Sequence, residues 1–166
     1  HILEKVKNMT NHFLSEIALS NTWCKYSEQI SKEHPTLMKR FSGGSLRYLA
    51  SSAFETIPEL FYEEMPNDEH EYVEIIGRKE NQRHKYYFRS DYLNVPKVID
   101  KFKAFISSSN GSGKFGAALT LPFVGYPKLG STETFLPIGC FETKKEAENL
   151  IKYFFINYAV LTATLR

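Results

Sequence analysis

Residues 143–158 place the strongest constraint on what this chain can fold into, because they carry a helix start signal followed by a helical apolar face. Thr143 stands three residues before Glu146, which is the spacing of a capping box. Six apolar residues then share one helix face: Ala147, Leu150, Ile151, Phe154, Phe155 and Tyr158. A helix with one apolar face buries that face against its domain. We therefore predict a long amphipathic helix near the C-terminus, packed on the core.

The region before this helix is patterned as strands. Residues 72–76 and 84–89 are two β-rich runs joined by polar residues around Glu80, Asn81 and Gln82, which predicts a hairpin. Further extended segments are predicted over 102–107, 117–124 and 134–138, and we expect 102–107 and 134–138 to be neighbours in one sheet. Helices, then strands, then one long helix predict an α+β fold with a mixed or antiparallel sheet.

The start of the chain is predicted to be helical. Ile2, Val6, Met9, Phe13 and Ile17 recur at steps of three and four, which places them on one helix face. We expect residues 1–70 to be a helical lead-in or connector, partly belonging to the same domain, and residues 71–166 to form the main domain. Because the chain begins with His and is helical from the start, we expect it to be part of a longer polypeptide.

Composition excludes several classes of protein. Apolar residues make up 42% of the chain and aromatic residues 14%, which is a globular composition. No stretch reaches the roughly 18–20 uncharged apolar residues of a membrane span, so no membrane partner is expected. Cys24 and Cys140 are the two cysteines, and they belong to no CxxC or Cys/His cluster. A disulfide scaffold and a structural zinc site are therefore not expected, and a reducing, cytoplasmic location is favoured.

Charge is unevenly distributed along the chain. Residues 55–74 contain eight acids and no Lys or Arg, whereas residues 78–114 contain nine Lys and Arg against three acids. Aromatic residues interleave the basic stretch, and cations mixed with aromatic rings are typical of a surface that binds nucleic acid. A solvated charged face is the alternative for both segments.

No motif supports catalysis by this chain. Residues 111–116 match GxGxxG, but a dinucleotide site needs a helix to begin there, and the sequence that follows is a poor helix start. The phosphate-binding loop pattern, GxSxG and HExxH are all absent. We expect no catalytic residue, metal or cofactor in this chain, while a flexible loop over 108–116 that bears Lys114 remains able to grip a phosphate.

Five segments, in order, resemble a known family. Residues 89–92, 100–103, 110–113, 130–134 and 139–153 are similar to the C-terminal target-recognition part of bacterial restriction–modification adenine methyltransferases, a group that includes fused restriction enzymes and TaqI-like specificity domains. The chain departs from the family pattern at residues 155–158, which lack two of its positive charges. The resemblance implies double-stranded DNA as a partner and a methyltransferase domain upstream, which holds S-adenosylmethionine and flips the adenine.

The resemblance also implies a set of DNA-contacting residues. Candidates for reading base edges are Asn110, Ser112, Lys114, Thr132, Glu133 and Thr134, on two loops expected to share one surface. Candidates for phosphate contacts are Arg83, Lys85, Arg89 and Lys103. For Thr132–Thr134 the alternative is the start of a strand. Two other functions remain open at this point: a protein–protein interaction module that uses the acidic segment, and a small enzyme that binds a nucleotide.

Overall fold

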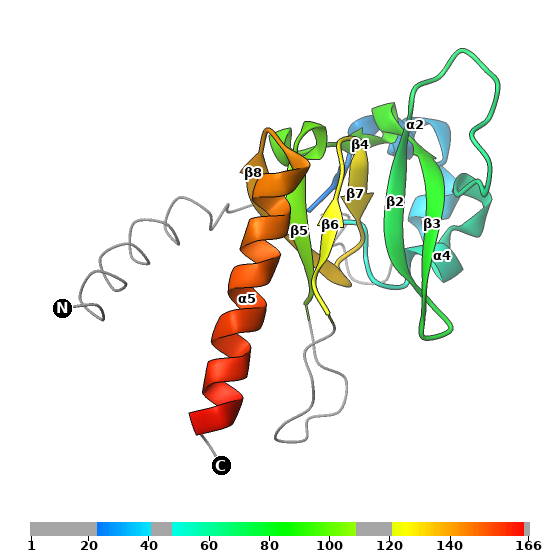
Figure 1. Cartoon of the computed structure of the whole chain (residues 1–166). Coiled ribbons are helices and arrows are strands. Elements are labelled where there is room, and N and C mark those ends of the chain that lie inside the picture. Colours follow the sequence, from blue (N-terminus) through cyan, green and yellow to red (C-terminus); the bar gives the residue numbers. More distant parts are fainter. Residues whose placement is uncertain (1–22, 41–47, 109–120, 165–166) are drawn as a thin grey trace.

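The computed structural model describes residues 23–40, 48–108 and 121–164, which form an α+β fold (Figure 1). The described strands make three sheets: β1 (Lys25–Tyr26) with β4 (Leu93–Asn94), a second sheet of order β3–β2–β7, and a third of order β6–β5–β8. The predicted fold class is confirmed. The helix predicted over 2–17 lies outside the described residues.

Short helices connect and flank the strands. Three are α-helical, α2 (Glu28–Glu33), α3 (Pro35–Met38) and α4 (Ala53–Thr56), and three are 3₁₀ turns, η1 (Pro58–Leu60), η2 (Ser90–Tyr92) and η3 (Lys97–Asp100). The long helix is α5 (Lys144–Thr164). No described helix is both long and apolar enough to span a bilayer.

The predicted hairpin is formed by β2 (Tyr72–Lys79) and β3 (Gln82–Arg89). Pairing runs from Tyr72 opposite Arg89 to Lys79 opposite Gln82, so both strands reach further than predicted. The reason is the turn, which contains Glu80 and Asn81 alone, at φ 51° and 62°. A two-residue loop with both φ values positive matches the twist of the flanking strands and lets them pair up to the turn.

The second sheet is completed by a strand from far along the chain. β7 (Leu129–Ser131) lies parallel to β2, with Glu74 opposite Leu129 and Ile76 opposite Ser131. In the third sheet β5 (Phe102–Ser107) lies between β6 (Phe123–Gly125) and β8 (Phe135–Phe141), antiparallel to both. The predicted proximity of 102–107 and 134–138 is therefore confirmed. Of the segment predicted over 117–124, Phe123 and Val124 belong to β6, and residues 117–120 lie outside the described part.

Helix α5 packs on the outer face of the third sheet. Leu150, Ile151 and Phe154 lie against Ala104 of β5 and two side chains of β8, and Ala147 is buried beside them. The prediction is wrong for Phe155, which is 42% exposed. Figure 1 shows that α5 also runs on past the ends of the strands that it covers. The side chain of Tyr158 lies outside the described residues.

Two apolar clusters hold the sheets together. One joins the second and third sheets through Ile76, Leu129, Phe105 and Phe135. The larger cluster lies on the other face of the β2–β3 hairpin and contains residues from 24–61 as well as residues from 73–99. The described residues before β2 thus share one core with the hairpin and hold it from behind.

Replacing Thr143 by Ala is expected to lower the free energy of unfolding by about 1 kcal/mol. The Thr143 hydroxyl accepts from the amide of Glu146 at 3.3 Å, and the Glu146 carboxylate accepts from the amide of Thr143 at 2.9 Å. Removing the hydroxyl leaves a helix amide without this acceptor. Urea unfolding followed by circular dichroism measures the change, with Thr36→Ala, at an exposed helix position, as the control. Equal effects of the two substitutions would contradict the capping role.

Candidate nucleic-acid interface

The end of the β2–β3 hairpin carries three cations, with Arg78 and Arg83 on one face of the two strands and Lys79 on the other. Arg78 and Arg83 are directly opposite each other in the sheet, and Lys79 is opposite Gln82. Among the described residues, none of the three cations forms an ion pair with a carboxylate, whereas most cations near them in the sequence do. Like charges on directly opposite strand positions destabilise a hairpin. This arrangement therefore costs stability in the free protein, and a bound polyanion would remove the cost.

Arg83 is held over aromatic rings. Its guanidinium carbon lies 4.5 Å from the centre of the Phe123 ring and 5.5 Å from that of Phe135, and it donates to the carbonyl of Leu121 at 3.3 Å. Partial burial, together with the nearby charge of Arg78, lowers the pKa of Arg83, which nevertheless stays charged at neutral pH. The aromatic platform fixes the position of a guanidinium whose residue is exposed. Arg83 thus keeps its place as a phosphate-contact candidate.

Lys85 has protein partners that compete with phosphate. Its ammonium donates to the Tyr126 hydroxyl at 2.7 Å, lies 4.7 Å from the centre of that ring and is 3.5 Å from the Glu74 carboxylate. The Tyr126 hydroxyl in turn donates to Glu74. Despite burial, the hydrogen bond to Tyr126 and the charge of Glu74 raise the pKa of Lys85. Lys85 is exposed and charged, but part of its charge is already compensated.

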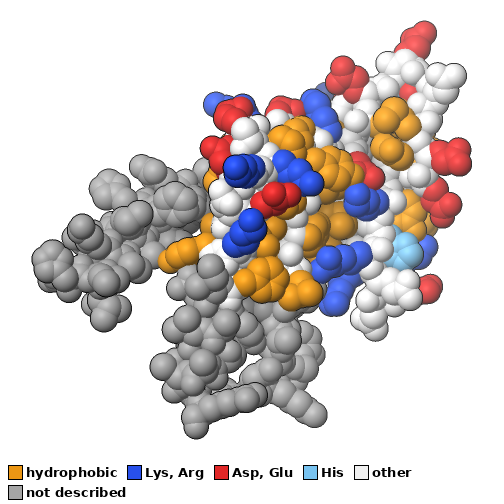
Figure 2. Space-filling model, in the orientation of Figure 1, with side chains coloured by type: hydrophobic (Ala, Val, Ile, Leu, Met, Phe, Trp, Pro, Cys, Tyr) orange, Lys and Arg blue, Asp and Glu red, His pale blue; other side chains and the backbone are white. Residues whose placement is uncertain are grey.

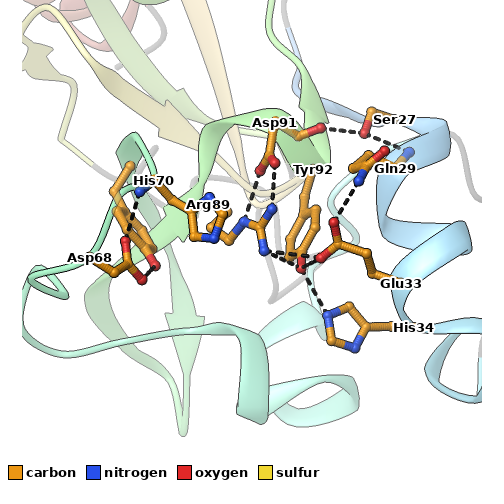
Figure 3. Close-up of polar contacts among 10 residues, drawn as sticks. Ser27, Gln29, Glu33, His34, Asp68, His70, Arg89, Asp91 and Tyr92 are labelled. Carbon is orange, nitrogen blue, oxygen red and sulfur yellow. Dashed lines mark hydrogen bonds and ion pairs between the residues drawn. The ribbon is translucent and has the colours of Figure 1, made fainter.

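Arg89 is enclosed by acceptors rather than facing solvent (Figure 3). Its guanidinium donates to both Asp91 oxygens at 3.0 and 2.5 Å, to Glu33 at 3.0 Å and to the Tyr92 hydroxyl at 2.7 Å. The side chain is only 13% exposed. The prediction that Arg89 contacts phosphate is therefore not supported by its geometry, because two carboxylates already neutralise it. Arg89 instead joins the end of β3 to helix α2.

The Tyr92 hydroxyl is the centre of this network. It donates to Glu33 at 2.5 Å, accepts from Arg89, and lies 2.9 Å from Nε2 of His34. Because a hydroxyl has one proton to donate, Nε2 of His34 is the donor in the third contact. The hydrogen bond from Tyr92 is the main reason why the pKa of Glu33 falls to about 2. Glu33 is thus ionised at any physiological pH. Arg89, Tyr92 and Glu33 hydrogen-bond to one another within the protein.

Lys103 and Thr132 are buried, and the predictions that they contact DNA are wrong. Lys103 is 1% exposed, and its ammonium donates to the carbonyls of Val98 and Ile99 at 3.1 and 3.0 Å. Burial lowers the pKa of Lys103 to about 8. Thr132 is 0% exposed, with its amide donating to Ile76 and its hydroxyl to that of Thr134. Lys103 is buried because α5 covers one face of β5 and the second sheet covers the other. Thr132 is buried in the turn that follows β7.

The remaining base-reading candidates divide into two groups. Glu133 and Thr134 are half-buried next to β8, where the Glu133 amide donates to Leu49 and the Thr134 carbonyl accepts from the Ser108 amide. Asn110, Ser112 and Lys114 lie outside the described residues. The predicted common surface of the two loops therefore stays a prediction.

Residues that sequence reasoning left unassigned lie at the tip of the hairpin. Arg78 and Lys79 were part of the basic stretch, and Asn81 and Gln82 were part of the connecting turn. Asn81 and Gln82 are exposed, and Arg78 and Lys79 are half-buried. The signal that could have located them is Asn at the second position of a two-residue turn, which fixes where the strands end.

Acidic side chains occupy the opposite end of the same two strands. The loop over 62–71, which leads into β2, carries exposed Glu63, Glu64, Asp68, Glu69 and Glu71. Figure 2 shows acidic side chains gathered over this loop at the upper right, and Lys and Arg side chains below, over the hairpin. The two ends of β2 are about 23 Å apart at the usual rise of a strand. A polyanion would therefore be repelled at one end and attracted at the other.

The described residues contain no cluster of three or more His, Cys, Asp or Glu side chains that could hold a metal ion. Compared with protein-family models, with curated proteins and with solved structures, the chain matches none of them. The likeness to target-recognition domains thus rests on its sequence motifs. Two of these motifs are structural in this fold: residues 89–92 build the Arg89 network, and residues 130–134 are largely buried.

Proposed function

We propose that this chain is the DNA-reading module of a restriction–modification enzyme. The observation that carries the proposal is the group of three cations without carboxylate partners, Arg78, Lys79 and Arg83, at the exposed end of the β2–β3 hairpin. Duplex DNA carries one negative charge per roughly 1.7 Å of axis, and cations that neutralise phosphates release condensed counterions. The hairpin supplies such cations at the end of the sheet that is remote from the acidic loop.

The finer identity of the parent enzyme is drawn from the family resemblance. It is an adenine methyltransferase, or a restriction enzyme fused to one, in the bacterial cytoplasm. The upstream domain binds S-adenosylmethionine and carries out catalysis, and this chain transfers no methyl group by itself. The acidic loop over 62–71 supports the same orientation, because it keeps the phosphate backbone away from the start of β2.

Replacing Arg78, Lys79 and Arg83 together by Gln is expected to weaken binding of the full 166-residue chain to duplex DNA of any sequence. Each lost phosphate contact removes about 0.9 from the slope of log affinity against log salt, so the slope should flatten by roughly 2 to 3. Fluorescence anisotropy with a labelled random-sequence duplex at several salt concentrations measures both quantities.

The matched control carries the same change in net charge. Lys97, Lys145 and Lys152 are exposed, lie away from the hairpin and form no ion pair with a described carboxylate. Their triple Gln variant should retain the wild-type slope. Equal slopes for the two triple variants, or no DNA binding by the wild-type chain, would overturn the proposal. Binding of a basic protein through the acidic loop, without DNA binding, would favour a protein–protein module instead.

A further inference from the structure

We propose that the β2–β3 hairpin enters the major groove of DNA as a two-stranded ribbon, and that the amide side chains of Asn81 and Gln82 read adenine there. This inference rests on the proposed DNA-binding function and adds the specificity-determining residues. It moves base reading from the loops predicted by sequence to the tip of the hairpin.

The hairpin extends beyond the rest of its sheet. β7 pairs with β2 only from Glu74 to Ile76, and on the other edge Tyr62 bridges to Tyr87. Beyond these points, residues 77–84 pair only with each other among the described residues. Figure 1 shows the turn projecting past the neighbouring strands. Two strands about 4.8 Å apart fit a major groove that is about 12 Å wide.

The root of the ribbon is held firmly. Gly77 packs so closely against the ring of Phe54 and the methyl group of Thr132 that a Cβ atom there would lie 2.6 to 2.9 Å from them. Phe54 and Thr132 are buried in the core of the domain. The tip is therefore a projecting element on a rigid base, which is the arrangement that precise readout of base edges requires.

The two-residue turn places polar side chains at the tip of the hairpin. Glu80 and Asn81 both have positive φ values, a conformation that Asn adopts readily and Glu does not. Glu80, Asn81 and Gln82 are all exposed, so the amides face solvent at the leading edge of the ribbon.

The positions of the side chains suggest a division of labour. Arg78 and Arg83 are one residue pair behind Lys79 and Gln82, and they lie on both strands of the ribbon. Cations on both edges can contact phosphates on the two sides of a groove, which positions the ribbon without reading sequence. The amides at the tip then face the base edges. Asn and Gln form paired hydrogen bonds with N6 and N7 of adenine in the major groove.

The test compares sequence preference before and after removal of the tip amides. The full chain and its Asn81→Gly/Gln82→Ala variant are each used to select duplexes from a pool with a randomised segment. Gly keeps the positive φ of the turn, and a single Gln82→Ala variant, at a strand position, checks that any effect does not come from an altered turn. An Asn67→Gly/Asn149→Ala variant, at exposed positions outside the hairpin, is the control.

We expect the wild-type chain and the control to enrich a motif that contains adenine, by ten-fold or more over the best mismatch. The tip variant should lose the preference at one or two adjacent positions, while its affinity for random duplex and its salt slope stay within two-fold of wild type. An unchanged preference in the tip variant, or a wild-type chain that binds DNA without preference, would overturn this inference and leave DNA binding intact. A wild-type chain that binds no duplex would overturn the proposed function itself.

Discussion

Replacement of Phe54 by Ala is expected to lower the free energy of unfolding by about 3–5 kcal/mol, a large part of the stability of a domain of this size. Phe54 is 2% exposed, and its ring lies 4.8 Å from that of Phe61 and 4.7 Å from that of Tyr86, edge to face. Truncation leaves a cavity behind the β2–β3 hairpin. Urea unfolding measures the loss, and Phe155→Ala, which removes an exposed ring, should change stability by no more than about 0.5 kcal/mol.

A second substitution tests whether the ring of Phe54 supports the hairpin directly. Gly77→Ala places a methyl group 2.6 Å from the Phe54 ring, and such overpacking costs about 1–3 kcal/mol. In the Phe54→Ala background this clash is gone, although the methyl group of Thr132 remains at 2.9 Å. The two substitutions should therefore be less destabilising together than the sum of their separate effects. Strict additivity would show that the close approach does not determine the packing.

Replacement of Lys103 by Met is expected to change how stability depends on pH. Burial lowers the pKa of the folded Lys103 from 10.5 to about 8. Below pH 8 both the folded and the unfolded chain carry the proton, and the folded state bears the cost of a buried charge. Between pH 8 and 10.5 the folded chain releases its proton first, so the stability of the wild type should rise relative to Lys103→Met by about 3 kcal/mol.

The comparison between variants removes the contribution of titrating groups that do not interact with Lys103. Cys24 does interact with it: burial raises the pKa of the Cys24 thiol to about 11, which destabilises both proteins as pH rises above 9, and the charge of Lys103 lowers that pKa in the wild type alone. Val98 and Ile99 each keep a backbone donor, from Lys101 and Lys128, so Met leaves neither carbonyl unsatisfied. Urea unfolding at pH 7 to 10.5 makes the measurement, with the exposed Lys97→Met as control. A difference between wild type and Lys103→Met that does not vary with pH would contradict a charged, buried lysine.

Elements defined by short-range patterns were predicted well. Three features show this: the capping box at Thr143, the apolar spacing of α5 and the polar turn between β2 and β3. Each depends on residues within a few positions of each other, so local backbone and side-chain geometry favours it without help from the rest of the fold. The proximity of β5 and β8 in one sheet was also predicted, because both strands are rich in apolar residues. The prediction failed for Phe155 for a non-local reason, since the packing of the helix on the sheet decides which residues of its apolar face are covered.

The candidate site was harder to predict, because accessibility depends on what covers a residue. Lys103 alternates with apolar neighbours as a surface lysine would, yet α5 covers one face of β5 and the second sheet covers the other. Arg89 belongs to a basic strand, but Glu33, its partner, lies 56 positions earlier in the chain. Sequence spacing carries no information about either contact.

The amino-acid sequence by itself therefore determined the class of fold, the hairpin, the long C-terminal helix and the separation of acidic from basic segments, because each follows from local pattern and composition. Tertiary structure alone decided which cations remain available. It paired Arg89 with Glu33 and Asp91, and it buried Lys103 and Thr132. It left three cations at the projecting tip of the hairpin without carboxylate partners: Arg78, Lys79 and Arg83. The physical reason is that desolvation and ion pairing are set by neighbours in space, and those neighbours come from distant parts of the chain.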